Sequence, residues 1–225
     1  MSTVPRHHLP ADIERTSMSI IESELRARNI DLPPETAAVG KRVIHTTADF
    51  DYAENLRFTP QAVSLGVQAL QQTVPIVTDT NMAKAGISKP SLAKLNTQAY
   101  CFMADPSVAD QARRNGTTRA VAAMRYAAGT MPGALLAVGN APTALLEIAD
   151  LIEGGLRPAL VVGVPVGFVN VVESKERLLQ VCEAAGVPAI VAMGRKGGSN
   201  VAAAICNALL YTALDTIDPS RRGWQ

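Results

Sequence analysis

Short apolar runs that alternate with longer amphipathic segments constrain this chain more than any other feature. Each run has only four or five residues, and polar residues or glycine follow it. Such runs are typical of parallel strands covered on both faces, because each right-handed connection returns the chain to the same end of the sheet. The predicted strands are Pro75–Thr78, Ala99–Met103, Leu135–Val138, Ala159–Gly163 and Ala189–Ala192.

The segments between these runs carry helical periodicity or helix-start signals. Thr59-Pro60 and Asp105-Pro106 each place a capping residue before a proline, which suits the first position of a helix. In a first helix, Asp12–Arg28, we expect Asp12 as the cap and an apolar side formed by Ile13, Ile20, Ile21 and Leu25. Further helices are predicted at Thr118–Ala128, Leu145–Ile152, Glu173–Ala185 and Val201–Leu209.

This order predicts an α/β fold: a single three-layer domain with a mostly parallel central sheet covered by helices on both faces. At 225 residues, with no Ser/Gly/Pro-rich linker, one large domain is expected at 11–225, preceded by a flexible N-terminal arm at 1–10. The strand order is not predictable from the sequence.

Charge and cysteine usage exclude several classes of protein. The net charge of +1 gives no global field for nucleic acid or membrane binding, so an anionic ligand must be held by local basic groups. No apolar run has membrane-spanning length and no signal peptide is evident, so we expect a cytoplasmic protein. Cys101, Cys182 and Cys206 lie far apart in apolar segments, which suits reduced core residues and offers no metal-ligand spacing.

A dense polar stretch, Arg42–Asp51, marks the first candidate site. Val43 and Ile44 are predicted to be a strand, and His45, Thr47 and Asp49 then follow at its carboxyl end. His45 is the one histidine outside the N-terminal arm, and its ordinary pKa near ~6.5 suits proton exchange at neutral pH. The alternative is a loop histidine whose hydrogen bonds are simply satisfied.

Other polar residues collect after the predicted strands. Asp79, Thr80 and Asn81 follow one strand, and Asn140 follows another. The segment after the last strand comprises Gly194, Arg195, Lys196, Gly197, Gly198, Ser199 and Asn200. We predict an anion site there, because the glycines permit tight backbone bends and the next helix begins with free N–H groups. Arg195 and Lys196 add two positive charges. A tight turn with solvated basic residues is the alternative.

Basic residues elsewhere in the chain differ in their expected surroundings. Arg119 follows Gly116-Thr117-Thr118 at a helix start, where a guanidinium can hold a carboxylate in a bidentate pair. Lys175, between Glu173 and Glu176, and the Arg113-Arg114 pair are instead expected to face water.

The residue inventory favours proton transfer over other chemistry. There is no Gly-x-Ser-x-Gly elbow, no Walker loop and no Gly-x-Gly-x-x-Gly fingerprint, and His45 alone offers too few nitrogen ligands for a transition metal. One proton donor or acceptor with several anion anchors and no cofactor motif indicates an isomerase or lyase acting on a multiply charged anion.

Five linked motifs follow one another along the chain: Arg42–Asp51, Asp79–Met82, Gly139–Ala144, Gly163–Glu176 and Gly194–Asn200. Together they resemble the precorrin-8X methylmutase family of cobalamin biosynthesis. The resemblance runs from about Asp12 to Leu214, with the motifs in family order, and residues 1–10 lie outside it.

The resemblance implies an isomerase that moves a methyl group from C-11 to C-12 of a corrin-type tetrapyrrole, giving hydrogenobyrinate, or cobyrinate when cobalt is in the ring. It also implies no cofactor, a homodimer with active sites near the subunit boundary, and His45 as the proton donor to the macrocycle. Product handover to the next pathway enzyme fits the same assignment.

With a macrocycle of this kind as substrate, the remaining candidates are predicted to shape its binding site. Thr47 and Asp49 would orient His45, and basic residues would meet the acetate and propionate arms of the ring. The binding residues are expected to be Arg15, Ser17, Arg42, Thr47, Asp79, Thr80, Asn81, Arg119, Asn140, Arg195, Lys196, Gly197, Gly198, Ser199 and Asn200.

Two other functions use the same anion anchors. A tetrapyrrole-binding carrier would hold the corrin product without any need for His45, and a phosphate- or nucleotide-binding enzyme would use the Gly194–Asn200 segment. Whether the ring already contains cobalt is left open by the sequence.

Overall fold

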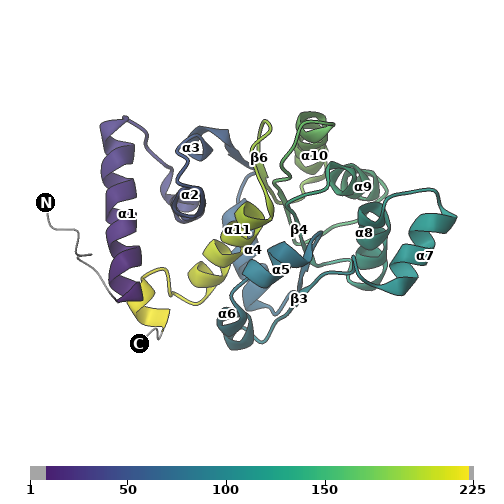
Figure 1. Cartoon of the computed structure of the whole chain (residues 1–225), viewed down its shortest axis with the longest axis horizontal. Helices are drawn as coiled ribbons and strands as arrows, with labels where there is room; N and C mark the ends of the chain where they lie inside the picture. Colours follow the sequence, from purple (N-terminus) through teal and green to yellow (C-terminus); the bar gives the residue numbers. More distant parts are fainter. Residues whose placement is uncertain (1–8, 223–225) are drawn as a thin grey trace, which may run out of the picture.

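A six-stranded sheet forms the middle layer of residues 9–222, the part of the chain that the computed structural model describes (Figure 1). Its strand order is β1-β6-β5-β4-β2-β3, and β1 alone runs antiparallel, beside β6. The strands are β1 (Leu56–Phe58), β2 (Ile76–Thr78), β3 (Ala99–Tyr100), β4 (Leu135–Val138), β5 (Leu160–Gly163) and β6 (Ala189–Ala192). The predicted, mostly parallel sheet is confirmed.

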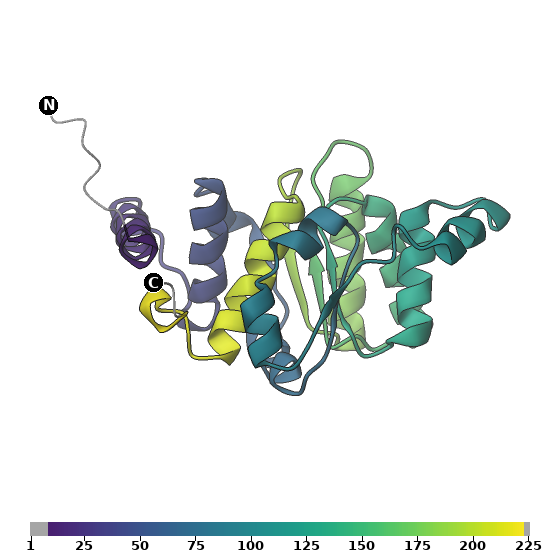
Figure 2. The same cartoon turned by 60° about the horizontal axis from the view of Figure 1, so that its bottom comes forward.

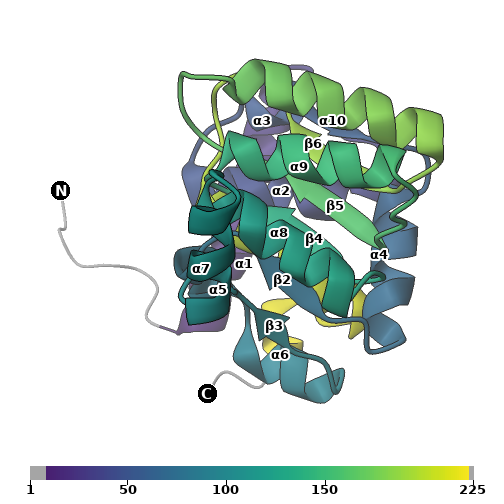
Figure 3. The same cartoon turned by 90° about the vertical axis from the view of Figure 1, so that its right-hand side faces the viewer.

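Helices cover both faces of this sheet, as Figure 1 shows in edge view. One face carries α2 (Pro34–Thr47), α4 (Ala62–Gln71), α5 (Asn81–Gly86), α6 (Lys89–Lys94) and α11 (Ser199–Ala213). The other carries α7 (Pro106–Arg114), α8 (Arg119–Thr130), α9 (Pro142–Glu153) and α10 (Val171–Ala185), of which α8, α9 and α10 lie side by side in Figure 3. The short α3 (Tyr52–Asn55) links α2 to β1.

Each side chain of a central strand enters one of two hydrophobic cores. In β4, Leu135 and Ala137 pack on the α11 side, whereas Leu136 and Val138 pack on the α9 side. All four residues are buried, because both faces are covered. The three-layer, single-domain prediction is therefore confirmed.

The first helix lies outside this sandwich. Figure 2 shows α1 (Pro10–Ala27) beyond α2, with the 3₁₀ turn η1 (Pro219–Arg222) beside its N-terminal end. Of the predicted arm, residues 1–8 lie outside the described part, and Pro10 already begins α1. Asp12 is therefore inside the first turn rather than at the cap. Of the predicted apolar side, Ile21 and Leu25 are buried but Ile13 and Ile20 are exposed.

The strand predicted at Val43–Ile44 is wrong, because both residues belong to α2. Pro34 stands at the helix start, where its missing N–H does no harm, and Val39, Val43 and Ile44 recur at helical spacing to bury one side. The helix ends when Ala48 adopts a left-handed conformation with φ 53°. His45 therefore lies in the last turn of a helix and not after a strand.

The Thr59-Pro60 start is also misplaced. Thr59 N donates to Ala189 O at 3.0 Å and its Oγ1 accepts from Ala189 N at 2.8 Å, which extends the β1–β6 pairing by one residue. The helix begins later, at Ala62, after Gln61 in a left-handed conformation. The strand β1 was not predicted, because three residues are too few for a periodic pattern.

The strand order places a switch point between β2 and β4. From β2 the chain moves outward to β3 and then returns to the opposite side of β2 for β4, β5 and β6. In open α/β sheets the ligand crevice lies outside the carboxyl ends of the strands at such a point. Within residues 9–222, no helix combines the length and the apolar character that crossing a membrane requires.

Candidate functional site

The carboxyl ends of β2 and β4 are tied together by one buried carboxylate. Asp79, directly after β2, accepts hydrogen bonds from the amides of Gly139, Asn140 and Ala141, each at 2.8 Å. Burial raises the pKa of Asp79, and these amide hydrogen bonds counteract the rise. Asp79 thus shapes the loop after β4 at the switch point and has no oxygen turned to solvent.

Glycines let three backbone segments pack against one another at this edge of the sheet. A Cβ on Gly139 would lie 2.7 Å from Ser199 Cα, and one on Gly197 would lie 2.2 Å from Val164 O. Gly198 has φ +136°, and its N–H donates to Val164 O at 2.8 Å. The segment Gly194–Asn200, named here the carboxyl-edge loop, is therefore fitted to the ends of β4 and β5 by backbone contact.

Hydroxyl groups link the same loop to β2. Thr80 caps α5 by accepting from Ala83 N at 3.0 Å, and its Oγ1 lies 2.8 Å from Ser199 Oγ. Around this pair, the amide side chains of Asn81, Asn140 and Asn200 are exposed. The structure therefore brings together the predicted residues that follow β2, β4 and β6.

The two cations of the carboxyl-edge loop have different surroundings. Lys196 Nζ donates to Asp49 and Asp51, at 2.6 Å each, and these hydrogen bonds raise the pKa of Lys196 well above its usual value. Arg195 is exposed and lies over the Phe168 ring, 5.6 Å from its centroid, without an ion pair among residues 9–222. Arg195 is thus the cation of this loop that is available to an incoming anion.

Apolar surface accompanies this cation. Phe168 is 83% exposed and Val169 76% exposed in the loop after β5, which stands beside the carboxyl-edge loop in Figure 2, and Met82 on α5 is also exposed. Arg119, at the first position of α8, is exposed as well. Exposed apolar and cationic side chains along one edge suit a flat, apolar ligand with anionic arms. Phe168 lies within the Gly163–Glu176 motif but is absent from the predicted binding residues, because nothing in that segment's sequence distinguishes an exposed phenylalanine from a buried one.

The prediction that Lys175 faces water is wrong. This side chain is fully buried, and its Nζ donates to the carbonyls of Gly194 at 2.7 Å and Lys196 at 2.8 Å. The flanking Glu173 and Glu176 are exposed as expected, and so is the Arg113-Arg114 pair.

His45 lies in a groove between α1 and α2. The groove holds about 400 Å³, and Ser17, Ile20 and Phe50 are among the residues that line it. The imidazole is half-buried and makes no hydrogen bond within the described residues. Burial, followed by the positive charge of Arg42, holds the pKa of His45 below its ordinary value. A half-buried imidazole with unused nitrogens can exchange a proton with a ligand in the groove.

The predicted orienting partners of His45 do not reach it. Thr47 Oγ1 donates to Val43 O at 2.9 Å inside the helix, and the Asp49 carboxylate is paired with Lys196. The pKa of Asp49 is lowered, chiefly by that hydrogen bond from Lys196. Asp49 therefore connects the end of α2 to the carboxyl-edge loop, and through it the His45 groove adjoins the sheet edge.

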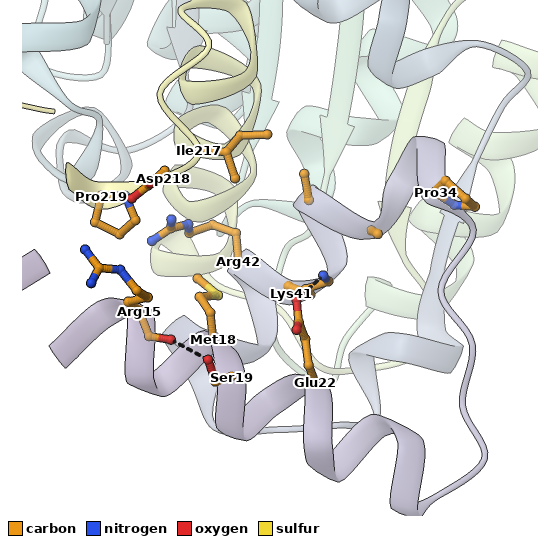
Figure 4. A pocket seen from close by; sticks show the side chains of 12 residues that line it. Arg15, Met18, Ser19, Glu22, Pro34, Lys41, Arg42, Ile217, Asp218 and Pro219 are labelled. Carbon is orange, nitrogen blue, oxygen red and sulfur yellow. Dashed lines mark hydrogen bonds and ion pairs between the residues drawn. The ribbon is translucent and has the colours of Figure 1, made fainter. Parts of the chain in front are cut away.

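Arg15 and Arg42 open to the other side of the α1–α2 seam. With Met18, Lys41 and Asp218 they line a pocket of about 500 Å³, shown in Figure 4. Arg15 has an exposed ion pair with Asp12 at 3.2 Å. The structure thus places the predicted Arg15 and Arg42 in a different hollow from His45 and Ser17.

Arg42 belongs to a buried ion cluster that the sequence did not reveal. Glu14 accepts from Arg42 at 2.5 Å and from Arg222 at 2.7 Å, and both guanidiniums lie against the Tyr211 ring. Burial pushes the pKa of Glu14 upward, but the hydrogen bonds from Arg42 and Arg222 outweigh it and leave this pKa below its usual value. The cluster joins α1, α2, α11 and η1.

The described residues contain no cluster of side chains suited to hold a metal ion. Within residues 9–222, no three His, Cys, Asp or Glu side chains gather closely enough to hold a metal ion. Cys101, Cys182 and Cys206 are free thiols.

Comparison with known proteins gives one consistent result. Residues 12–212 match the family model described as precorrin-8X methylmutase. The chain is 42% identical over 208 residues to the cobalt-precorrin-8 methylmutase of Leptospira interrogans, covering 90% of this chain and 94% of that protein. It is 45% identical over 206 residues to the protein of the same name from Salmonella typhimurium, covering 90% and 95%.

A solved structure agrees with this match. The precorrin-8X methyl mutase of Thermus thermophilus superposes with a TM-score of 0.82 at 40% identity, covering 90% of this chain and 98% of that one.

Proposed function

This chain belongs to the precorrin-8X methylmutase family, isomerases of cobalamin biosynthesis, and we propose that it moves a methyl group from C-11 to C-12 of the precorrin-8 macrocycle. The product would be hydrogenobyrinate, or cobyrinate from a cobalt-containing ring. The reaction changes no atoms overall, so it needs neither an oxidant nor a nucleophile, only a macrocycle held in its reactive protonation state.

His45 supplies the proton in this proposal, and its groove is the observation that carries it. The imidazole is half-buried, has both nitrogens unused by the described residues, and has a lowered pKa, which makes its protonated form a stronger acid. Protonating a ring nitrogen draws electron density toward it while the methyl group migrates, and the proton then returns to His45. A positioned acid of this kind is worth about 10²–10⁴-fold in rate.

The ring's carboxylate arms would be held by cations at the margins of the site. Arg195 and Arg119 lie exposed at the sheet edge, while Phe168 offers an apolar surface to the flat macrocycle. Ser17 lines the groove beside His45, and Thr80, Asn81, Asn140 and Asn200 offer hydrogen bonds along the edge. Arg15 and Arg42, on the opposite side of the seam, would reach only arms that extend around α1 or α2.

We propose further that the enzyme is a homodimer whose subunit boundary passes near His45. Ile13 and Ile20 are seven residues apart on α1, so they share one face, and both are exposed. Ile20 also lines the His45 groove, so a second subunit that covers this face would lie beside the active site. The three free thiols suit a reducing compartment, and we place the enzyme in the cytoplasm.

Incubation with metal-free precorrin-8X and, separately, with its cobalt complex tests the reaction. We expect a corrinoid absorbance spectrum to develop. The reaction should be faster with the cobalt complex, because the relatives from Leptospira and Salmonella are named for that substrate. Tight retention of unchanged substrate would instead indicate a carrier. Failure to bind either ring would refute the proposed function.

A further inference from the structure

Lys175 is a buried charge for which the proposed reaction has no direct use. Its side chain is 0% exposed in α10, beneath the carboxyl-edge loop. The ammonium donates to Gly194 O and Lys196 O and has no carboxylate within ion-pair distance among residues 9–222. Burial lowers the pKa of Lys175 to about 8.

Such a placement is unfavourable for folding alone. A buried ammonium without a counter-ion is costly, and an apolar side chain of the same length fills the space without that cost. The benefit must therefore lie in what the ammonium does to the loop above it.

Its two hydrogen bonds fix the direction of two peptide units. In a planar trans peptide the C=O and the N–H point in opposite directions, and the described chain has no cis peptide. Because the carbonyls of Gly194 and Lys196 point to Lys175, the N–H groups of Arg195 and Gly197 in the same peptides point away from it. Neither N–H donates to another group in residues 9–222. Arg195 is exposed and Gly197 half-buried, so both N–H groups are free to donate to water or to a ligand.

We propose that Lys175 is a positioning residue that turns the N–H groups of Arg195 and Gly197 outward as a receptor for one carboxylate arm of the corrin. The receptor combines two backbone donors, the exposed Arg195 guanidinium, and the buried ammonium behind them. Successive outward amides form concave anion sites, and an uncompensated positive charge beneath them strengthens the attraction. The inference rests on the proposed function, because it names a binding element for the same substrate.

Lys175→Met tests this role, with Lys89→Met as the matched control. The control removes one positive charge from an exposed site on α6. Cobyrinate and a corrin whose arms are all carboxamides serve as probes, with Kd measured by absorbance or calorimetry. We expect Lys175→Met to weaken cobyrinate binding about tenfold, to leave the amidated corrin within about twofold, and to raise KM while kcat stays nearly constant. Lys89→Met should match the wild type throughout. Unchanged cobyrinate affinity, or equal weakening of both ligands, would overturn the inference.

Two further measurements keep the test decisive if Lys175→Met does not fold. Lys175→Gln retains a neutral donor and should show a smaller but still carboxylate-selective loss, whereas wild-type affinity would count against the proposal. In the wild-type protein, cobyrinate should shift the amide NMR signals of Arg195 and Gly197, and the amidated corrin should not. Equal shifts with both ligands, or none, would contradict the inference. A wild-type protein that binds no cobyrinate at all would instead refute the proposed function.

Discussion

The proton chemistry proposed for His45 depends on its place in the last turn of α2. Partial negative charge at a helix C-terminus favours the imidazolium. Burial and the positive charge of Arg42 oppose it, and they prevail, because the pKa of His45 lies below its ordinary value. In the free enzyme at neutral pH the imidazole is therefore mostly neutral, and a polyanionic substrate would draw a proton onto it.

Replacing His45 by glutamine should separate catalysis from binding. Glutamine retains polarity in the groove but cannot deliver a proton, so kcat should fall about 10²-fold or more while the Kd for cobyrinate stays within about threefold. Single-turnover absorbance and equilibrium titration provide the two values. Wild-type turnover by His45→Gln would refute the assignment of His45 as the acid.

The pH dependence of the reaction rate should also reveal the protonation of His45. If the free enzyme acts with His45 protonated, kcat/KM should fall as pH rises through the lowered pKa of His45, which lies below ~6.5. The corresponding fall in kcat should occur at higher pH, because the carboxylates of the bound substrate favour the imidazolium. Steady-state rates between pH 5 and 9 measure both. A kcat/KM that increases with pH across this step would show that His45 acts as a base.

Single residues were predictable where their chemistry is local. The Asp105 cap is confirmed, because its side chain accepts from Ser107 N just after it in sequence. Lys175 was mispredicted because exposed glutamates flank it, and the carbonyls that its ammonium contacts come from a loop nineteen and twenty-one residues away. Nothing in its own neighbourhood signals that burial. Glu14 was missed for the same reason, since Arg222 is distant in sequence.

Among the elements, α1 depends on one seam and on the Glu14 cluster for its attachment. Residues of α1 contact chiefly α2 and η1, and Glu14 lies at the point where they meet. The helix forms one wall of the His45 groove. Its attachment therefore affects the proposed active site as well as stability.

Glu14→Gln should loosen this helix. Two buried guanidiniums would lose their carboxylate, which costs about 3 kcal/mol of the free energy of unfolding as measured by urea denaturation at pH 7. Because the pKa of Glu14 is lowered in the folded state, its contribution is complete above the ordinary carboxyl pKa of ~4.3 and is lost as pH falls through the lowered value. The wild type and Glu14→Gln should therefore become equally stable at acid pH. A constant difference across this range would show that the carboxylate charge plays no part.

The carboxyl-edge loop allows a matched pair of glycine substitutions. Gly197→Ala places a Cβ against Val164 O at 2.2 Å, so the backbone must shift, and stability should fall by about 2 kcal/mol or more. Gly129→Ala, exposed near the end of α8 with nothing within 4 Å, should be neutral or stabilising by up to about 1 kcal/mol. Thermal unfolding of both variants measures this. Equal stability for both would contradict the close fit of the loop.

Elements were predictable where the pattern is long or buried on both faces. The runs that form β2, β4, β5 and β6 could be assigned because a parallel strand covered on both faces consists almost entirely of apolar residues. The stretch Arg42–Asp51 was misassigned because two apolar residues were interpreted as a strand, although Val39, four positions earlier, completes a helical spacing.

For the whole molecule, the sequence predicted three layers but not their arrangement. Strand order depends on which helices cover which face, and that is settled only by long-range packing, such as that of α11 against α2, α4 and α5. The switch point between β2 and β4, where open α/β sheets place their ligand crevice, therefore needed the structure.

The proposed dimer can be tested at this scale. Light scattering after gel filtration should give twice the mass of one chain for the wild type. The double variant Ile13→Glu/Ile20→Glu should have the mass of one chain, because two charges on this exposed face of α1 oppose its burial in a subunit interface. A dimer that persists in the double variant would move the subunit boundary away from α1. A monomeric wild type would refute the dimer.

The close fit of Gly139, Gly197 and Gly198 has a consequence for how this enzyme can change. Main-chain packing and the buried Lys175 ammonium shape the carboxyl-edge loop, whereas the exposed side chains of Arg195 and of the neighbouring Asn140 make no hydrogen bond to it within residues 9–222. If these side chains meet the substrate as proposed, mutation, whether natural or designed, can alter which peripheral groups of a tetrapyrrole are accepted without reshaping the framework that presents them.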